Sequence, residues 1–317
     1  MSILRLVKLW LGFLTGDDLT GEGEFSQSPG MKSSLILFAL LAAATVSQAQ
    51  SPVPAAAAVR KLADGFKFTE GPSVGPDGRI YFSDIPNARI MVYDPKTAIT
   101  TVHRENSGGA NGLVWTSEGH LIACEGKARR VSRQHGTQIT AVAELVEGKK
   151  LNAPNDLALD GKGGLYFSDP AYGRKPDELE QGVEGVYHVA LADGTITRVV
   201  GDLVRPNGLV FSPDRRILYI ADAGAGKIWA YDVTGPGKLG KKRAFADAGS
   251  DGMTVDTQGR VYLTWKGEIW IFSAEGKELG RIACPEAPAN CLLTGKTLYI
   301  TARTGFYSID LDAEGVQ

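Results

Sequence analysis

Six acidic or amide residues recur at regular intervals along the chain, each at the start of a short apolar segment. Successive members are separated by 39 to 52 residues. These opening residues are Glu70, Asn111, Asn155, Asn207, Asp251 and Asn290. Carboxylate and amide oxygens are the hard ligands that calcium and magnesium prefer. If the fold brings them together, the two carboxylates would balance the charge of one divalent cation.

The segments that contain the opening residues share one pattern of strands and turns. Each opening residue leads into an apolar strand, then a turn with Gly or Pro-Asp, then a second apolar strand, as in PNGLVFSPDRRILYIAD around Asn207. A third strand with Tyr or Trp and a weaker fourth strand complete most repeats. Four-stranded repeats of about 40 to 50 residues are typical of β-propellers.

This pattern predicts an all-β fold, a six-bladed β-propeller of four-stranded antiparallel blades. In such a ring the innermost strand of every blade starts beside the central channel. We therefore expect the opening residues to converge there and form a hard-cation site. For any single Asn or Asp that precedes Gly, the alternative is that the residue only tolerates a turn into the strand.

Two segments lie outside the six repeats. The last repeat runs out of chain after FYSIDL, whereas AVRKLADGF at residues 58 to 66 precedes the first repeat. We expect this N-terminal segment to pair as the outer strand of the final blade, which would remove a free sheet edge. A polar segment from Asp169 to Gly182 lengthens the interval after Asn155, and we expect it to be a loop over one mouth of the channel.

Composition excludes some classes of protein. The net charge of -2 over 317 residues shows no basic excess that would favour nucleic acid. CxxC and His-rich spacings typical of structural zinc sites are absent from the sequence. Cys284 and Cys291 flank a short turn and either pair in an oxidising compartment or remain free thiols, whereas Cys124 has no obvious mate.

The first 57 residues do not show the pattern of strands and turns found in the repeats. Residues 31–49 combine a Lys, an apolar core and a small-residue cleavage site, as a secretory signal peptide does. The apolar core is too short for a stable membrane span, although an uncleaved interfacial anchor is the alternative. We interpret residues 1–30 as a non-native upstream extension or an unstructured segment, 50–57 as a linker and 58–317 as one propeller domain, in a periplasmic or secreted protein.

The motifs TEGP, NAPNDL, RPNG and SDGM occur in this order between residues 58 and 313. Together they resemble the SMP-30/gluconolactonase/LRE family, six-bladed propellers that hydrolyse lactones with one divalent metal in the channel. The resemblance implies metal ligation by Glu70, Asn207 and Asp251, and contact of Asn155 with the metal, its water or the substrate. Ca²⁺ is the expected ion, with Mg²⁺, Mn²⁺ and Zn²⁺ as alternatives. Ala153 stands where some members carry an arginine that holds a sugar lactone.

The function expected from this resemblance is hydrolysis of a sugar lactone or related small lactone to the hydroxy acid. The metal would polarise the carbonyl, and Asp251 would assist water as the base. Asn155, Asn111 and Tyr172 are candidates for substrate contact. The sequence does not indicate an oligomeric state.

Three other interpretations compete with a metal-dependent lactonase. Gly71 to Gly75 reads GPSVG, the GxSxG pattern of a serine hydrolase, but we expect Ser73 to lie in a strand and not at a strand-to-helix turn. A non-catalytic binding propeller of the NHL or WD type would have no need for Glu70 and Asp251 in the channel. An enzyme of the strictosidine synthase or paraoxonase kind is the third, and paraoxonase-like members would be expected to use histidines near the metal.

The interpretation of the N-terminal segment makes a direct prediction. If Met31 is the initiator and the signal is cleaved after Ala49, N-terminal sequencing of the natural protein should find a mature chain that begins at Gln50. A mature chain that retains Leu4 to Leu14 would contradict it.

Overall fold

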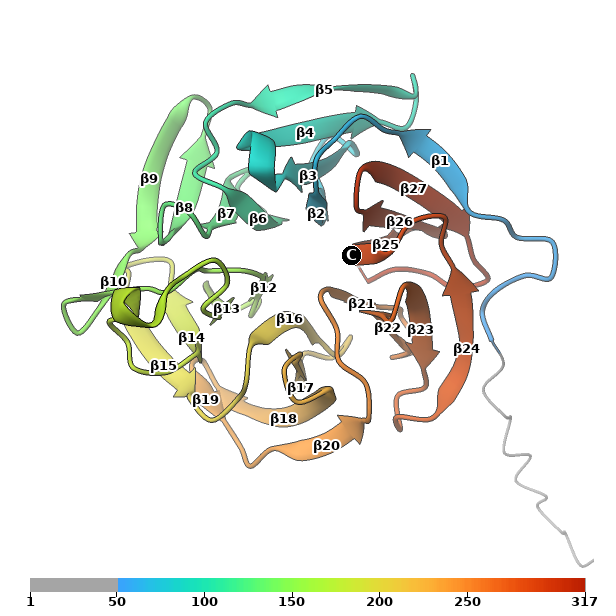
Figure 1. Ribbon diagram of the computed structural model, residues 1–317. Helices are drawn as coiled ribbons and strands as arrows, with labels where there is room; N and C mark the ends of the chain where they lie inside the picture. The colour runs from blue at the N-terminus through green and yellow to red at the C-terminus, as the bar shows by residue number, and fades with distance from the viewer. Residues whose placement is uncertain (1–50, 317) are drawn as a thin grey trace, which may run out of the picture. The chain divides into compact units, whose positions relative to one another are not determined.

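The computed structural model describes residues 51–316 and is nearly all β, with two short 3₁₀ turns. Six antiparallel sheets form a ring around a central channel (Figure 1). The predicted six-bladed propeller is therefore confirmed. No helix in this part of the chain has the length and apolar character needed to cross a membrane. The predicted upstream extension and signal peptide lie outside the described residues.

In the first five blades the strands follow one another in sequence from the channel outward. Blade 1 contains β2 (Thr69–Val74), β3 (Ile80–Asp84), β4 (Arg89–Asp94) and β5 (Ile99–Arg104). Blade 2 contains β6 (Ala110–Trp115), β7 (Leu121–Glu125), β8 (Arg130–His135) and β9 (Gln138–Ala143). Blade 3 contains β12 (Leu157–Leu159), β13 (Gly164–Asp169), β14 (Gly185–Ala190) and β15 (Ile196–Val200).

The second half of the ring repeats the arrangement. Blade 4 contains β16 (Pro206–Phe211), β17 (Ile217–Asp222), β18 (Lys227–Gly235) and β20 (Arg243–Ala246), with β19 (Lys238–Leu239) as an additional short strand on β18. Blade 5 contains β21 (Met253–Val255), β22 (Val261–Trp265), β23 (Glu268–Phe272) and β24 (Glu278–Ala283). Blade 6 contains β25 (Pro288–Thr294), β26 (Thr297–Ala302), β27 (Gly305–Asp310) and β1 (Arg60–Ala63).

The ring is closed by β1, as the sequence predicts. This strand pairs antiparallel with β27, with Arg60 opposite Ser308 and Lys61 opposite Tyr307. Blade 6 thus combines the two ends of the propeller in one sheet, and β1 covers the edge that β27 would otherwise expose. Just after β1, Phe66 packs edge-on against Phe82 of blade 1 with ring centroids 5.2 Å apart.

Burial explains why the second strand of a blade has consecutive apolar residues, as in Ile80, Tyr81 and Phe82 of β3. All residues of β3, β7 and β13 are buried. Such strands are enclosed by the neighbouring blades on both faces, so alternation between apolar and polar residues is lost. The core accordingly consists of clusters in which large side chains of adjacent blades pack together.

Some local features differ from the predicted pattern. A hairpin of β10 (Leu145–Val146) and β11 (Lys149–Lys150) precedes blade 3. The predicted loop from Asp169 to Gly182 contains the 3₁₀ turn η2 (Pro176–Glu178), and η1 (Ile85–Asn87) follows β3. Cys124, Cys284 and Cys291 are free thiols, so the disulfide alternative for Cys284 and Cys291 is not realised in this structure.

The glycines that follow opening residues allow the inner strands to approach one another closely. Gly71 has a φ of +51°, and a Cβ built on it would lie 2.0 Å from the carbonyl oxygen of Asn111 in blade 2. A Cβ on Gly252 would lie 2.0 Å from Cγ of Asn290 in blade 6. Any side chain at these positions would push adjacent blades apart. The recurrent glycine therefore serves contact between blades, in addition to the turn suggested by the sequence.

Closure by β1 makes a testable prediction for stability. Deletion of residues 56 to 66 exposes the edge of β27 and removes Phe66 from its cluster with Phe82 and Phe306. Loss of one large buried side chain alone costs about 3 kcal/mol. We expect thermal unfolding of the variant to show a clearly lower melting temperature or aggregation, and an unchanged melting temperature would contradict the closure.

The matched control for this deletion is Arg60→Ala. That change removes only the exposed ion pair between Arg60 Nη2 and Asp310 Oδ2, at 2.9 Å. Exposed pairs contribute about 1 kcal/mol or less to stability, so the control should unfold at nearly the temperature of the parent protein.

Candidate active site

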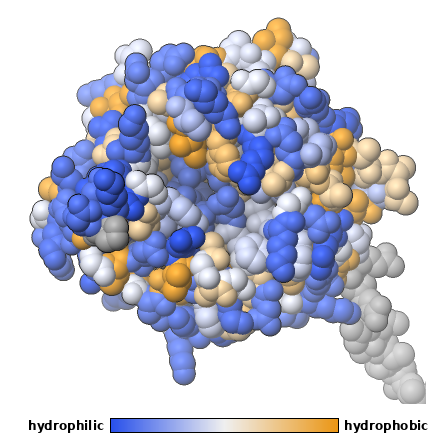
Figure 2. All heavy atoms as spheres, in the orientation of Figure 1, coloured by the Kyte–Doolittle hydropathy of each residue, from blue (hydrophilic) through white to orange (hydrophobic). Residues whose placement is uncertain are grey.

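A cavity of about 590 Å³ opens into the channel at the centre of the ring. Figure 2 shows a hollow at the middle of the propeller face that is turned to the viewer, bordered by hydrophilic and hydrophobic residues. The polar side chains that line the cavity are Glu70, Asn111, Lys127, Asn155, Tyr172, Arg174 and Asp251. An apolar wall on one side is formed by Phe68, Ile85 and Pro86. Four of the six opening residues therefore share this cavity.

The opening residues reach the channel from different blades but from equivalent places. Glu70, Asn111 and Asn207 lie at the second position of β2, β6 and β16. Asn155 and Asp251 lie two residues before β12 and β21. The start of each inner strand faces the channel, so residues far apart in sequence meet at one end of it.

Asn207 joins the site through its amide group. Its Nδ2 donates hydrogen bonds to Asp251 Oδ1 at 2.6 Å and to Tyr172 Oη at 3.3 Å. Its Oδ1 atom is buried and accepts no hydrogen bond from the described residues, and the same holds for Asn111 Oδ1. A buried carbonyl oxygen without a donor is costly, so both oxygens are available to a cation or a substrate hydroxyl.

The two carboxylates of the cavity disfavour each other's charged form. Burial raises the pKa of Glu70 well above its usual value, and repulsion from Asp251 and Asp156 adds to the effect. Burial likewise raises the pKa of Asp251 to about 6, although the hydrogen bond from Asn207 lowers it in part. Both carboxylates would be stabilised in their charged form by a nearby positive charge.

The donor set fits a hard divalent cation. Within residues 51–316 no three His, Cys, Asp or Glu side chains are grouped so that they could hold a metal. A cation in this cavity would therefore need amide oxygens beside the two carboxylates. The orphaned oxygen of Asn207 and the paired charges of Glu70 and Asp251 meet that need, and oxygen-only ligation suits calcium or magnesium.

A third buried carboxylate in the channel was missed in the sequence analysis. Asp156 follows Asn155 directly and lines a second cavity, of about 500 Å³. Burial raises its pKa to about 7, although its Oδ1 atom accepts a hydrogen bond from the Leu157 amide. Because consecutive residues of an extended chain point to opposite sides, Asn155 and Asp156 face different cavities. This alternation between consecutive residues is the feature of the sequence that could have identified Asp156 as a channel residue.

Asn290 departs from the predicted convergence. It lines the second cavity with Asp156, and not the first cavity with Glu70. Hydrogen bonding by its side chain lowers the pKa of both carboxylates, against the effect of burial. Asn290 therefore stabilises the charged form of Glu70 from the side of the second cavity. The six opening residues do not form one symmetric ring of ligands.

Serine hydrolase chemistry finds no support at the GxSxG pattern. Ser73 lies inside β2, opposite Tyr81, and lines the second cavity. No Ser, His or Cys lines the first cavity in the described part of the chain. His188 is occupied by Asp160, with Nε2 and Oδ2 2.9 Å apart on blade 3.

Comparison with known proteins agrees with this arrangement. Residues 68–304 match the SMP-30/Gluconolactonase/LRE-like region. A gluconolactonase from Zymomonas mobilis is 29% identical over 280 residues, 77% of this chain and 78% of the relative. The pentonolactonase XacC of Haloferax volcanii is 29% identical over 254 residues, 74% of this chain and 81% of the relative.

Among solved structures, a gluconolactonase from Xanthomonas campestris is 27% identical to this chain. The two superpose with a TM-score of 0.77 over 82% of this chain and 91% of the other. The family match spans most of the propeller, including all the opening residues that line the first cavity. This chain therefore belongs to the SMP-30/gluconolactonase/LRE-like family.

Proposed function

We propose that this protein is a lactonase that opens a sugar lactone or related small lactone to the corresponding hydroxy acid. The observation that carries the proposal is the meeting of Glu70, Asn155 and Asp251 in one cavity, with Asn207 bonded to Asp251. Family membership and the lactonase names of the relatives support the same reaction class.

The residues that would hold a divalent cation are Glu70, Asn155, Asn207 and Asp251. Ca²⁺ is the ion that this oxygen donor set favours most, and Mg²⁺, Mn²⁺ and Zn²⁺ are the alternatives for the test below. When bound, the cation would polarise the lactone carbonyl and balance the negative charge that develops on its oxygen.

Asp251 is the base in this proposal. Its Oδ1 atom accepts the hydrogen bond from Asn207 Nδ2 and would also be its ligand to the cation, which leaves the other oxygen to accept a proton from water. Burial raises the pKa of Asp251 to about 6, and a bound cation would lower it again, which keeps the carboxylate charged and able to accept a proton. The water oxygen bonds to the carbonyl carbon, the ring C–O bond breaks, and the departing oxygen takes the proton back from Asp251. The product is one hydroxy acid.

The surrounding side chains would orient the lactone. Tyr172 comes from the loop over the cavity, and its hydroxyl lies 3.3 Å from Asn207 Nδ2. Asn111 lines the cavity from β6 with an oxygen that lacks a donor among the described residues. The apolar wall at Phe68 and Ile85 would pack against the C–H face of the ring.

Removal of either channel carboxylate should abolish turnover. We expect Asp251→Asn to lower kcat for lactone hydrolysis by a factor of about 10² to 10⁴, the range for loss of a positioned acid–base group. Glu70→Gln should also lower kcat strongly, because it removes a ligand of the cation. The measurement is a pH-indicator assay over a panel of aldonolactones and small aliphatic lactones. Substantial residual turnover with metal present would contradict the assignment.

Two matched controls separate this effect from general damage. Asp160→Asn also removes a buried carboxylate, but one that is bonded to His188 away from the cavity. Ser73→Ala removes the serine of the GxSxG pattern, which faces the second cavity. Both variants should hydrolyse lactones at the parent rate per folded molecule, and loss of activity in Ser73→Ala would favour a serine hydrolase.

Metal binding should change the pH dependence of stability. The raised pKa values mean that, without metal, the folded protein holds protons on Glu70 and Asp251 that the unfolded chain has already released. The free energy of unfolding of chelated protein should therefore fall as pH rises from about 4 to about 7. Calcium at about 100 times its Kd should restore about 2.7 kcal/mol, with a larger gain in melting temperature at pH 8 than at pH 5.

The control for this measurement is Glu70→Gln. It removes one of the two repelling charges, so chelated variant at pH 8 should be more stable than the chelated parent protein, by about 1 kcal/mol or more. The variant should also lose most of the response to calcium. If the melting temperature of the parent protein does not change when calcium, magnesium, manganese or zinc is added, the metal site is contradicted.

We also propose that the protein acts outside the cytoplasm, in the periplasm or after secretion. The basis is the signal-like pattern of residues 31–49. N-terminal sequencing, described above, tests this proposal independently of the reaction.

A further inference from the structure

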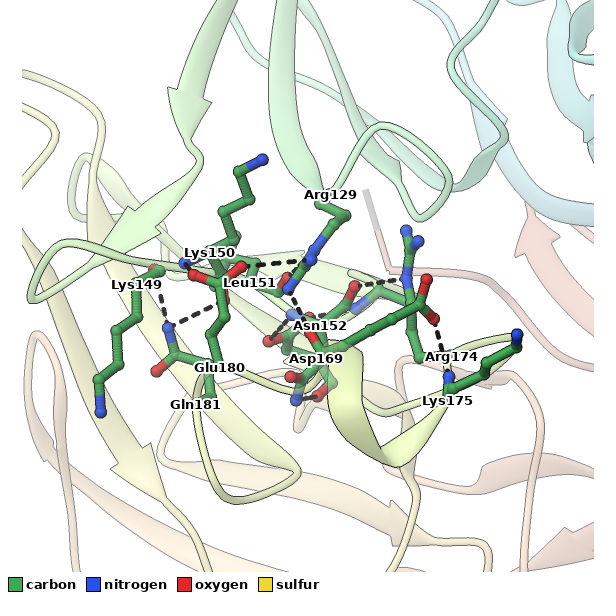
Figure 3. A network of polar contacts seen from close by, with 12 residues as sticks. Arg129, Lys149, Lys150, Leu151, Asn152, Asp169, Arg174, Lys175, Glu180 and Gln181 are labelled. Atoms are coloured by element: carbon green, nitrogen blue, oxygen red, sulfur yellow. Dashed lines mark hydrogen bonds and ion pairs between the residues drawn. The ribbon is translucent and has the colours of Figure 1, made fainter.

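Arg174 lines the first cavity from the loop that follows β13. Its Nε donates to the carbonyl of Asn152 at 3.1 Å, and its Nη2 donates to the carbonyls of Gly126 at 2.6 Å and Lys127 at 3.1 Å. Figure 3 shows Arg174 beside the Leu151 to Asn152 segment. These three bonds tie the loop to blades 2 and 3 and fix the guanidinium at the cavity wall.

Small neighbours make room for this guanidinium. Gly126 and Ala153 line the same cavity, and a Cβ on Gly126 would lie 3.8 Å from the Cβ of Ala153. The three backbone bonds use neutral acceptors, and the Arg174 guanidinium forms no ion pair within residues 51–316, although its charge lowers the pKa of the buried Asp169 in part. The three bonds also leave the two N–H groups of the Arg174 Nη1 atom free of hydrogen bonds to described residues.

Lys127 adds a second cation to the same wall. It lies in the turn between β7 and β8 and lines the cavity together with Arg174. Neither side chain forms an ion pair with any residue between 51 and 316. By contrast, Arg129 in the same turn pairs with Glu180, and Arg130 at the start of β8 pairs with Glu125. An unpaired cation that lines a concave site is placed to attract an anionic group.

Charge is therefore distributed unevenly within the cavity. Glu70 is 2% exposed, whereas Lys127 is exposed and Arg174 lies at intermediate depth. A ligand with a carbonyl at one end and a negative charge at the other would be held in one orientation. Its carbonyl would face the deep carboxylates and their cation, and its anionic end would face Lys127 and Arg174.

We propose that Lys127 and Arg174 form an anion subsite that selects lactones bearing a carboxylate remote from the lactone carbonyl. The inference rests on the proposed lactonase function and names its substrate class. A carboxylate would accept hydrogen bonds from Nη1 of Arg174 and from the Lys127 ammonium, and charge-assisted bonds of this kind are the strong ones.

A matched pair of lactones tests the subsite. D-glucono-1,4-lactone and D-glucaro-1,4-lactone have the same ring and differ at C6, which is a hydroxymethyl group in the first and a carboxylate in the second. We expect the parent protein, supplied with calcium, to show a higher kcat/KM for the glucaro compound. Arg174→Gln should lower the glucaro-to-glucono ratio about tenfold and Lys127→Gln about threefold.

Arg129→Gln is the matched control for the structural role of Arg174. Arg129 anchors the same loop, since its Nε donates to the Leu151 carbonyl at 2.6 Å and its Nη2 to the Glu178 carbonyl at 3.1 Å, but it does not line the cavity. Figure 3 shows both arginines in this network. The control should keep the substrate ratio of the parent protein. If Arg129→Gln and Arg174→Gln lower the glucaro-to-glucono ratio equally, the anion subsite is overturned, and the effect of Arg174 comes from anchoring the loop.

Binding of the ring-opened acids decides the proposal even if hydrolysis fails. Calorimetric titration should show tighter binding of D-glucarate than of D-gluconate, with the difference reduced in Lys127→Gln and in 0.5 M NaCl, where charges are screened. If neither lactone is hydrolysed but D-glucarate is preferred, the lactonase proposal fails and the anion subsite stands. A parent protein that prefers neither the glucaro lactone nor D-glucarate overturns the subsite.

Discussion

The site depends on how closely the inner strands approach one another around the channel. Gly71 and Gly252 leave no room for a side chain, because the backbone of Asn111 or the side chain of Asn290 from the next blade occupies that space. This contact holds the starts of the inner strands within reach of one another. Glu70 and Asp251, which lie 181 positions apart in the chain, are thereby held near enough to raise each other's cost of ionisation.

Burial of like charges is unfavourable in a folded protein unless something compensates for it. In this channel three carboxylates share the space, since Asp156 lies behind the cavity that Glu70 and Asp251 line. Amide groups of Asn207 and Asn290 compensate in part by hydrogen bonding. The cation proposed above would remove the remaining cost, because a positive charge favours the charged form of each carboxylate.

The ring also separates the parts of the site by their rigidity. The carboxylates and amides stand at the starts of inner strands that are enclosed by neighbouring blades. The apolar wall, Tyr172 and the two unpaired cations come from loops and turns at the mouth. The polar centre of the cavity is thus held by the blades, whereas its mouth is formed by loops and turns, which in this chain provide positive charge.

The repeat pattern alone was sufficient to predict the fold and the arrival of opening residues from different blades at the channel, where four of them line one cavity. Periodic Gly and Pro turns, apolar strand pairs and regular spacing follow from local backbone preferences, which sequence expresses directly. Closure by residues 58 to 66 followed from counting strands, and the convergence of Glu70, Asn111, Asn155 and Asp251 followed from radial symmetry.

Tertiary structure decided what symmetry could not. Asn290 occupies an equivalent position to the other opening residues yet lines the second cavity, and Asp156 joins the channel although it opens no repeat. Whether a side chain points up or down the channel depends on the exact register and bulge at each strand start, which one residue reverses. Arg174 is placed by three carbonyls from two other segments of the chain. Contacts of that kind leave no local pattern in the sequence, because their partners are brought together only when the ring closes.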